Sequence, residues 1–160
     1  SDLLQQEANP EHVHRLLDSL RNRAGRFSED GQFAEALADW DKAIEIAAPL
    51  LATMPATIKE GLVACLNSAS WIRATSPDHA VRDGARAIDL ARRACEITDW
   101  NDYQVFDTLA AAYAEAGDFD HAIEWQRSAM ERTTGDETEA FGARLEQYRA
   151  KQPYRDQTSP

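Results

Sequence analysis

Apolar and small residues recur along the chain with the period of an α-helix. In three places they stand at i, i+3, i+4 and i+7, or at part of that series. This is the spacing of residues on one side of a helix, so each place predicts an amphipathic helix. The three sets are Leu20, Ala24 and Phe27; Leu66, Ala69 and Ser70; and Phe106, Leu109, Ala110 and Tyr113.

A second helical pattern follows each set and is repeated in the sequence. Residues 31–46 reappear as residues 117–132, and a degenerate copy occupies residues 82–97. Each copy holds two alanines seven residues apart, and small residues two turns apart on one helix allow another helix to come close. The pairs are Ala36 and Ala43, Ala87 and Ala94, and Ala122 and Ala129.

The repeated unit is therefore a helix, a short turn and a second helix. Gly31 and Gly117 stand at the turn, where glycine tolerates the positive φ at which a helix stops. Asp118 and Asp120 follow at the start of a helix. Negative charge is favoured at a helix N-terminus, so we interpret both as capping residues.

The third unit resembles the tetratricopeptide repeat (TPR) family. Two positions depart from the family pattern: Gln126 stands where an aromatic residue is usual, and Arg23 replaces a leucine in the first unit. A bacterial variety of the family is similar over residues 67–78, over residues 107–118 and at the end of the chain, so the resemblance covers about residues 13–155 and implies a natural C-terminal end. The matching residues of the third unit are Phe106, Leu109, Ala110, Tyr113, Gly117, Ala122 and Ala129, and those at the end of the chain are 144–149 and 153–155.

The resemblance implies an all-α fold, a right-handed superhelical stack of three helix–turn–helix pairs plus a C-terminal capping helix. Corresponding alanines lie 51 and then 35 residues apart, against a family period of 34, so the middle repeat is irregular. Extra residues are expected at 47–57, where Pro49 and Pro55 end the helix or extend it with a kink, and in a longer turn at 75–84.

The expected organisation has three parts. We expect a lead-in at residues 1–12, a TPR domain at 13–151 and a tail at 152–160. A capping helix is needed because the last repeat would otherwise expose an apolar face. Within the domain we expect repeats at about 13–48, 57–98 and 103–134, and the capping helix at about 137–151.

Charge narrows the class of partner. The formal net charge is −11, which argues against nucleic acid because such binding depends on neutralising phosphates. Residues 99–139 hold eleven acidic residues and two basic ones, giving −9 of this total. One interpretation is a solvated helix surface that aids solubility, and the other is an acidic surface that steers a basic peptide or basic partner.

The sequence shows no segment suited to membrane insertion. The longest uncharged apolar run, residues 47–54, contains Pro49 and falls short of the ~20 residues of a membrane span. No signal peptide is visible. We expect a cytoplasmic protein by default, with export left open because the chain does not begin with Met. Cys65 and Cys95 match no metal or redox spacing and are expected to be buried thiols, with a disulfide as the alternative.

Catalytic and cofactor motifs are not found in the sequence. It contains no P-loop, dinucleotide fingerprint, nucleophile elbow or zincin helix. His12 and His14 point to different sides of a helix, which disfavours a shared metal. We expect no cofactor and no metal, and no enzyme activity.

In TPR proteins the first helix of each repeat lines a concave groove, and the resemblance implies the same here. Trp71 is the candidate anchor because buried aromatic residues dominate interface energetics. The alternative is that Trp71 packs into the turn at 75–84. We expect a Trp71→Ala and Asp107→Lys double change to keep helicity and abolish partner capture. The groove candidates are Asp18, Arg21, Asn67, Trp71, Gln104, Asp107, Ala111 and Glu115.

The function that follows is a non-enzymatic protein–protein interaction module or scaffold, binding a peptide segment or helix of a partner. Two alternatives remain open at this point. The chain is either a self-associating assembly module, hence a homo-oligomer, or the C-terminal regulatory part of a larger enzyme.

Overall fold

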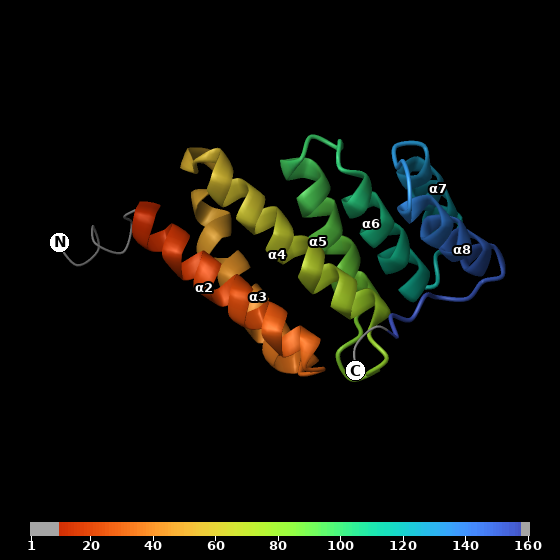
Figure 1. Ribbon diagram of the computed structural model, residues 1–160, viewed down its shortest axis with the longest axis horizontal. Coiled ribbons are helices and arrows are strands. Elements are labelled where there is room, and N and C mark those ends of the chain that lie inside the picture. Colours follow the sequence, from red (N-terminus) through yellow and green to blue (C-terminus); the bar gives the residue numbers. More distant parts are fainter. Residues whose placement is uncertain (1–9, 158–160) are drawn as a thin grey trace. The chain divides into compact units, whose positions relative to one another are not determined.

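The computed structural model describes residues 10–157, and they form helices without any strand in that range (Figure 1). The helices come in pairs joined by short turns, which confirms the expected all-α helical repeat. Of the expected lead-in, residues 1–9 lie outside the described range. The elements are α2 (Pro10–Glu29), α3 (Phe33–Ala47), the 3-10 helix η1 (Ala48–Thr53), α4 (Ala56–Thr75), α5 (Gly84–Ile97), α6 (Tyr103–Glu115), α7 (Phe119–Met130) and α8 (Glu137–Arg149).

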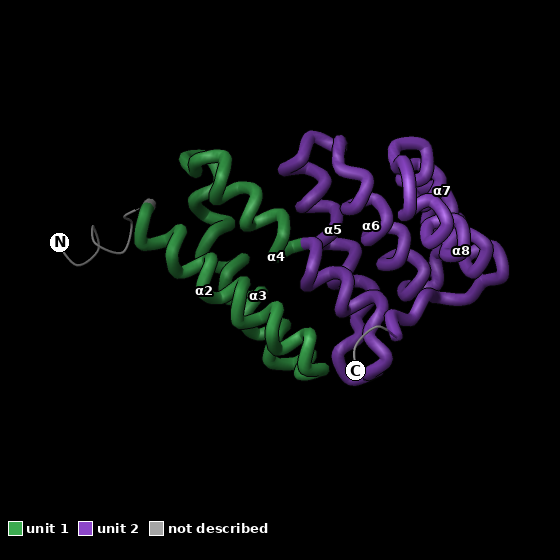
Figure 2. The backbone as a smooth tube through the Cα atoms, in the orientation of Figure 1, with its two compact units in different colours: residues 1–66, 159–160 green, residues 67–158 purple. Residues whose placement is uncertain are grey.

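The chain divides into two compact units (Figure 2). Of the described residues, 10–66 belong to unit 1 and 67–157 to unit 2. The division falls within α4, so this helix begins in unit 1 and ends in unit 2.

In unit 1, helices α2 and α3 pack through small residues. Ala36 and Ala43 are fully buried, and Gly31 makes the turn between the helices with φ of 73°. Both observations confirm the sequence prediction. The chain continues past Ala47 as η1 with Pro49 in its first turn, so the proline-containing segment extends the helix with a change of geometry.

Arg23 stands where the TPR pattern has a leucine, and the structure explains the exchange. Its guanidinium donates from Nε and Nη2 to the two carboxylate oxygens of Asp39 on α3, at 2.6 and 2.7 Å. These hydrogen bonds hold the pKa of Asp39 below its usual value. A charged pair therefore joins α2 and α3 at this position.

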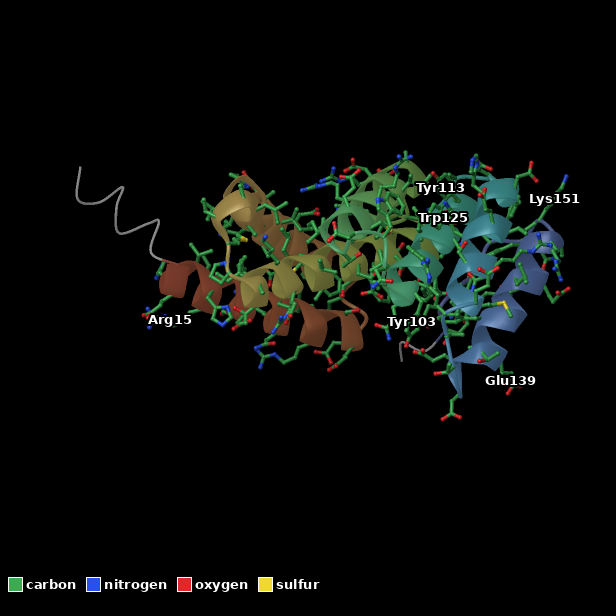
Figure 3. The ribbon with its side chains drawn as sticks, turned by 90° about the horizontal axis from the view of Figure 1, so that it is seen from above. Arg15, Tyr103, Tyr113, Trp125, Glu139 and Lys151 are labelled. Carbon is green, nitrogen blue, oxygen red and sulfur yellow. The ribbon has the colours of Figure 1, made fainter. Side chains whose placement is uncertain are left out.

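Unit 2 contains α5 to α8, which lie side by side in Figure 1. The alanine pairs of α5 and α7 are fully buried, and Gly117 makes the α6–α7 turn with φ of 82°. Asp118 accepts a hydrogen bond from the His121 amide and so caps α7, as predicted. Aromatic rings pack around Trp125 of α7, which is labelled in Figure 3. Its ring lies 5.3 Å from that of Trp100 and 5.2 Å from that of Phe106 on α6, between ring centroids.

Two thiols lie in the interior. Cys65 and Cys95 are free and at most 2% exposed. Burial raises the pKa of Cys65 to about 11 and that of Cys95 to about 12. Both cysteines therefore act as small apolar residues.

Between residues 10 and 157, no helix has the length and apolar character needed to cross a membrane.

Candidate functional site

The segment after α8 returns to the first helix of unit 2. Lys151 takes a positive φ of 54°, which turns the chain at the end of α8. Residues 152–157 then run, without helix, past the C-terminal end of α6 to the C-terminal end of α4 (Figure 1). Within the expected tail at 152–160, the name tail is used from here on for residues 153–156 alone. The residues that these four contact form the tail-binding face: Trp71, Ala74, Thr75, Glu115 and Arg144.

Arg144 of α8 is the central side chain of this face. It donates from Nε and Nη2 to the two carboxylate oxygens of Asp107 on α6, both at 2.9 Å. Gln126 of α7, fully buried, donates to the same carboxylate at 2.8 Å and to the Phe141 carbonyl at 3.3 Å. Burial raises the pKa of Asp107, and the Arg144 charge and the Gln126 hydrogen bond offset part of this rise. The network joins α6, α7 and α8.

Trp71 of α4 faces this arginine and the tail. Its Nε1 donates a 2.8 Å hydrogen bond to the Asp156 carboxylate. Its ring lies 5.7 Å from the ring of Tyr154, and the Arg144 guanidinium lies 5.6 Å from Trp71 and 5.2 Å from Tyr154, measured to the ring centroids. At these distances the cation is attracted to both aromatic rings.

Glu115, at the C-terminal end of α6, lies between two arginines. Arg82, from the turn before α5, donates to its Oε1 at 3.1 Å, and Arg155 of the tail lies 2.7 Å from its Oε2. Arg155 also donates to the Ala74 carbonyl at 3.3 Å. That carbonyl belongs to the last turn of α4, where carbonyl groups lack helical partners and attract cations.

Backbone hydrogen bonds fix the tail as well. The Asp156 amide donates to the Thr75 carbonyl at 2.9 Å. The turn that follows α4 is held by Arg82, which donates to the Ser76 carbonyl at 2.8 Å. The end of α4, the following turn and the tail are thus linked through Glu115 and its two arginines.

Of the sequence-predicted site residues, Trp71, Asp107 and Glu115 lie near one another through these contacts. The expectation that Asp107 faces an open groove is corrected, because Arg144 and Gln126 cover it and leave it 6% exposed. Ala111 is corrected for a similar reason: it is 1% exposed and belongs to an apolar cluster with Ala74, Ala87 and Ala112, against which Trp71 packs.

Among the described residues, no hydrogen bond joins Asn67 or Gln104 to the tail. Gln104 is exposed at the start of α6. Asn67 is half-buried, and its side-chain carbonyl has no hydrogen-bond partner among residues 10–157. Their predicted roles stay predictions.

The two candidates in unit 1 lie together on α2. Arg21 and Asp18 form an exposed ion pair at 3.0 Å, and His14 approaches the same carboxylate at 3.3 Å. Arg21 also lines a shallow hollow of about 540 Å³ on this helix. The other residues that line the hollow are Ser19, Asn22, Gly25, Arg26 and Glu29.

Sequence reasoning missed the partners of these side chains: Arg144, Gln126 and Arg155. One signal was present, because a glutamine at a core position of α7 requires a buried polar partner. Trp71 contacts the tail, and the alternative that it packs into the turn at 75–84 stays a prediction.

In the described part of the chain, no three His, Cys, Asp or Glu side chains are placed to hold a metal ion. The site residues are carboxylates paired with arginines, aromatic rings and open backbone carbonyls. This set can bind an extended chain by ionic, aromatic and backbone contacts.

Comparison with known proteins gives one match. Residues 104–134, which contain α6 and α7, match the family model described as tetratricopeptide repeat. No curated protein and no solved structure matches the chain. The matched segment, the paired helices and the glycine turns between them are consistent with a TPR-type protein.

Proposed function

We propose that the chain is a non-enzymatic protein-interaction module that binds an extended peptide segment of a partner on the tail-binding face of unit 2. A TPR repeat suggests a protein–protein interaction module in general. One observation supports the finer proposal: a non-helical stretch of chain already lies on this face, held by Trp71, Thr75 and Glu115.

The mechanism is presentation by preformed side chains. Arg144 holds its position through Asp107, and Arg82 holds Glu115, so neither must be ordered when a peptide arrives. Avoiding that ordering cost favours affinity. Trp71 supplies the aromatic anchor, since a tryptophan at the centre of an interface contributes strongly to binding.

Charge favours a partner with basic residues. Residues 99–139 carry −9 of the net charge. Arginines neutralise Asp107 and Glu115, but acidic side chains of α7 and α8 remain exposed, and their field steers a basic partner. These exposed residues are Asp120, Glu124 and Glu139.

Selection from a random peptide library tests the proposal. Peptides displayed on phage are panned on the full chain, and the enriched sequences are synthesised and titrated by calorimetry. We expect enriched peptides to bind the unchanged chain and to lose at least tenfold in affinity to Trp71→Ala. An Arg86→Ala chain is the matched control because Arg86 is on α5 with a 44% exposed side chain and forms an ion pair with Asp89 of its own helix.

Two results contradict the proposal. One is that no peptide is enriched above an unrelated helical protein. The other is that enriched peptides bind Trp71→Ala and the unchanged chain equally while circular dichroism shows both to be folded.

A further inference from the structure

We propose that residues 153–156 are an internal ligand of the tail-binding face, and that the peptide this face recognises carries an aromatic residue, an arginine and an acidic residue in succession. The inference rests on the proposed function and adds the chemistry of the partner. Each of three successive tail residues, Tyr154, Arg155 and Asp156, makes a separate contact with the face.

The aromatic position is recognised from two sides. The Tyr154 ring lies 5.7 Å from Trp71 and 5.2 Å from the Arg144 guanidinium, measured from the ring centroid. It also packs on the apolar cluster formed by Ala110, Ala114 and neighbouring side chains. A large ring that accepts a cation over its face is therefore selected here.

The basic position selects arginine over lysine. One Arg155 nitrogen lies 2.7 Å from the Glu115 carboxylate, and another donates to the Ala74 carbonyl at 3.3 Å. A planar guanidinium places two donors in a fixed fork, whereas an ammonium group is a single point charge. Lysine at this position would satisfy one of the two acceptors.

The acidic position combines side chain and backbone. The Asp156 carboxylate accepts from Trp71 Nε1 at 2.8 Å, and its amide donates to the Thr75 carbonyl at 2.9 Å. The backbone bond sets the direction of the peptide, and the indole selects an acceptor. Indole nitrogen donates only, so an arginine or lysine here would leave it unpaired.

A partner peptide must displace the tail to reach this face, and few backbone hydrogen bonds oppose that exchange. Within residues 153–156 the backbone makes one hydrogen bond to another backbone group, the one from Asp156 to Thr75. Arg155 is more exposed than its partner Glu115, with 28% against 15% of the side chain accessible. A short tether gives the tail an effective concentration on the order of millimolar. A peptide with the tail's own sequence must exceed that concentration to displace the tail, whereas a peptide that binds more tightly than the tail displaces it at lower concentration. Weakening the tail lowers the concentration that either peptide needs.

The test uses a synthetic peptide with the sequence of residues 151–157, Lys-Gln-Pro-Tyr-Arg-Asp-Gln. It is titrated by calorimetry into the unchanged full chain and into a full chain carrying Tyr154→Ala and Arg155→Ala. We expect saturable binding to the double variant and at least tenfold weaker binding to the unchanged chain. Gln152→Ala is the matched control, since Gln152 is exposed and lies beside the tail, and it should behave as the unchanged chain.

A second peptide with lysine in place of the arginine should bind the double variant at least fivefold more weakly. Asp156→Ala weakens the tail less than the double variant does, because it leaves Tyr154 and Arg155 in place and removes only the acceptor of Trp71. The Asp156→Ala chain should bind the tail peptide more tightly than the unchanged chain, by a smaller factor than the double variant.

The inference is overturned if the peptide binds neither the folded double variant nor Asp156→Ala. Equal binding to the unchanged chain, or indifference to the arginine-to-lysine exchange, overturns it as well. If library-selected peptides bind but the tail peptide does not compete with them, the proposed function stands and this inference fails. If the tail peptide binds the double variant and no library peptide is enriched, residues 153–156 bind this face, but the proposed function fails, and with it the part of the inference that concerns a partner peptide.

Discussion

Arg144 of α8 and Asp107 of α6 form a bidentate ion pair. Two hydrogen bonds of 2.9 Å join them, and their side chains are 11% and 8% exposed. Because Asp107 is on α6 and Arg144 is on α8, the pair connects the closing helix to a helix that is not its neighbour in sequence. The closing helix is thus fixed by charge as well as by apolar packing.

Removing one member of this pair should strongly destabilise unit 2. We expect Arg144→Met to lower the free energy of unfolding by about 3–5 kcal/mol, because it leaves the Asp107 carboxylate buried without its partner. Urea denaturation followed by circular dichroism measures the change. Arg149→Met is the control, since Arg149 pairs on the surface with Glu146 of its own helix. An equal loss in both variants would contradict the prediction. The same burial makes the Asp107→Lys change unsuitable for testing binding.

Gly84 and Gly25 should respond in opposite ways to alanine. A Cβ at Gly84 would lie 2.7 Å from the backbone nitrogen of Ala116, so Gly84→Ala should destabilise by roughly 1–3 kcal/mol through overpacking. A Cβ at Gly25, inside α2, would meet nothing within 4 Å. Gly25→Ala should therefore stabilise by roughly 0.5–1 kcal/mol. Thermal denaturation of the two variants checks the signs, and two shifts in the same direction would refute this reading.

Acid should weaken unit 1 through Asp39. Hydrogen bonds from Arg23 lower the pKa of Asp39 in the folded chain, so its contribution to stability is complete above the unfolded pKa of about 3.9. That contribution is lost as the pH falls through the lower, folded value. We expect the stability difference between the unchanged chain and Asp39→Asn to be constant from pH 5 to 7 and to narrow below about pH 4. Urea midpoints measure it, with Glu45→Gln, at an exposed position of the same helix, as the control.

Both thiols should be unreactive in the folded chain. Cys65 and Cys95 are buried, and burial raises their pKa values to about 11 and about 12. The thiolate is the reactive form, so little of it exists at pH 8. We expect Ellman's reagent to label neither cysteine within minutes in buffer and both in denaturant. Fast labelling of either thiol in buffer would argue against the buried placement.

Loss of the Trp71 hydrogen bond should loosen the tail without unfolding the chain. Trp71→Phe keeps an aromatic ring but removes the donor to Asp156. A hydrogen bond to a charged acceptor contributes roughly 1.5–3 kcal/mol, so the Asp156 amide should exchange with solvent about tenfold faster or more. Hydrogen exchange by NMR measures this rate. Trp100→Phe, which changes a ring stacked on Trp125 and removes no hydrogen bond to Asp156, should leave this rate unchanged.

The helices and their turns could be predicted because their signals are local. Periodicity over one or two turns marks each helix, and the alanine pairs and Gly31 and Gly117 stand within the segment whose geometry they determine. Asp118 caps the helix that begins at the next residue. In each case the cause lies within a few residues of its effect.

The site could be predicted only in part because its partners are distant in sequence. Trp71 and Glu115 were identified from their place in the repeat, but Trp71 meets Asp156 across 85 residues and Asp107 meets Arg144 across 37. No period in the sequence connects such positions. The role of Arg23 was equally hard to predict from the sequence, because its partner, Asp39, lies 16 residues away on the following helix.

The tail also affects the order in which the contacts of unit 2 can form during folding. Most helix–helix contacts join neighbours along the chain, which favours fast folding because little chain entropy is lost in closing short loops. The contacts of Trp71 and Ala74 with the tail span 85 and 81 residues. They form only after the tail has been synthesised, so during translation the end of α4 stays without these contacts until the last residues of unit 2 are made.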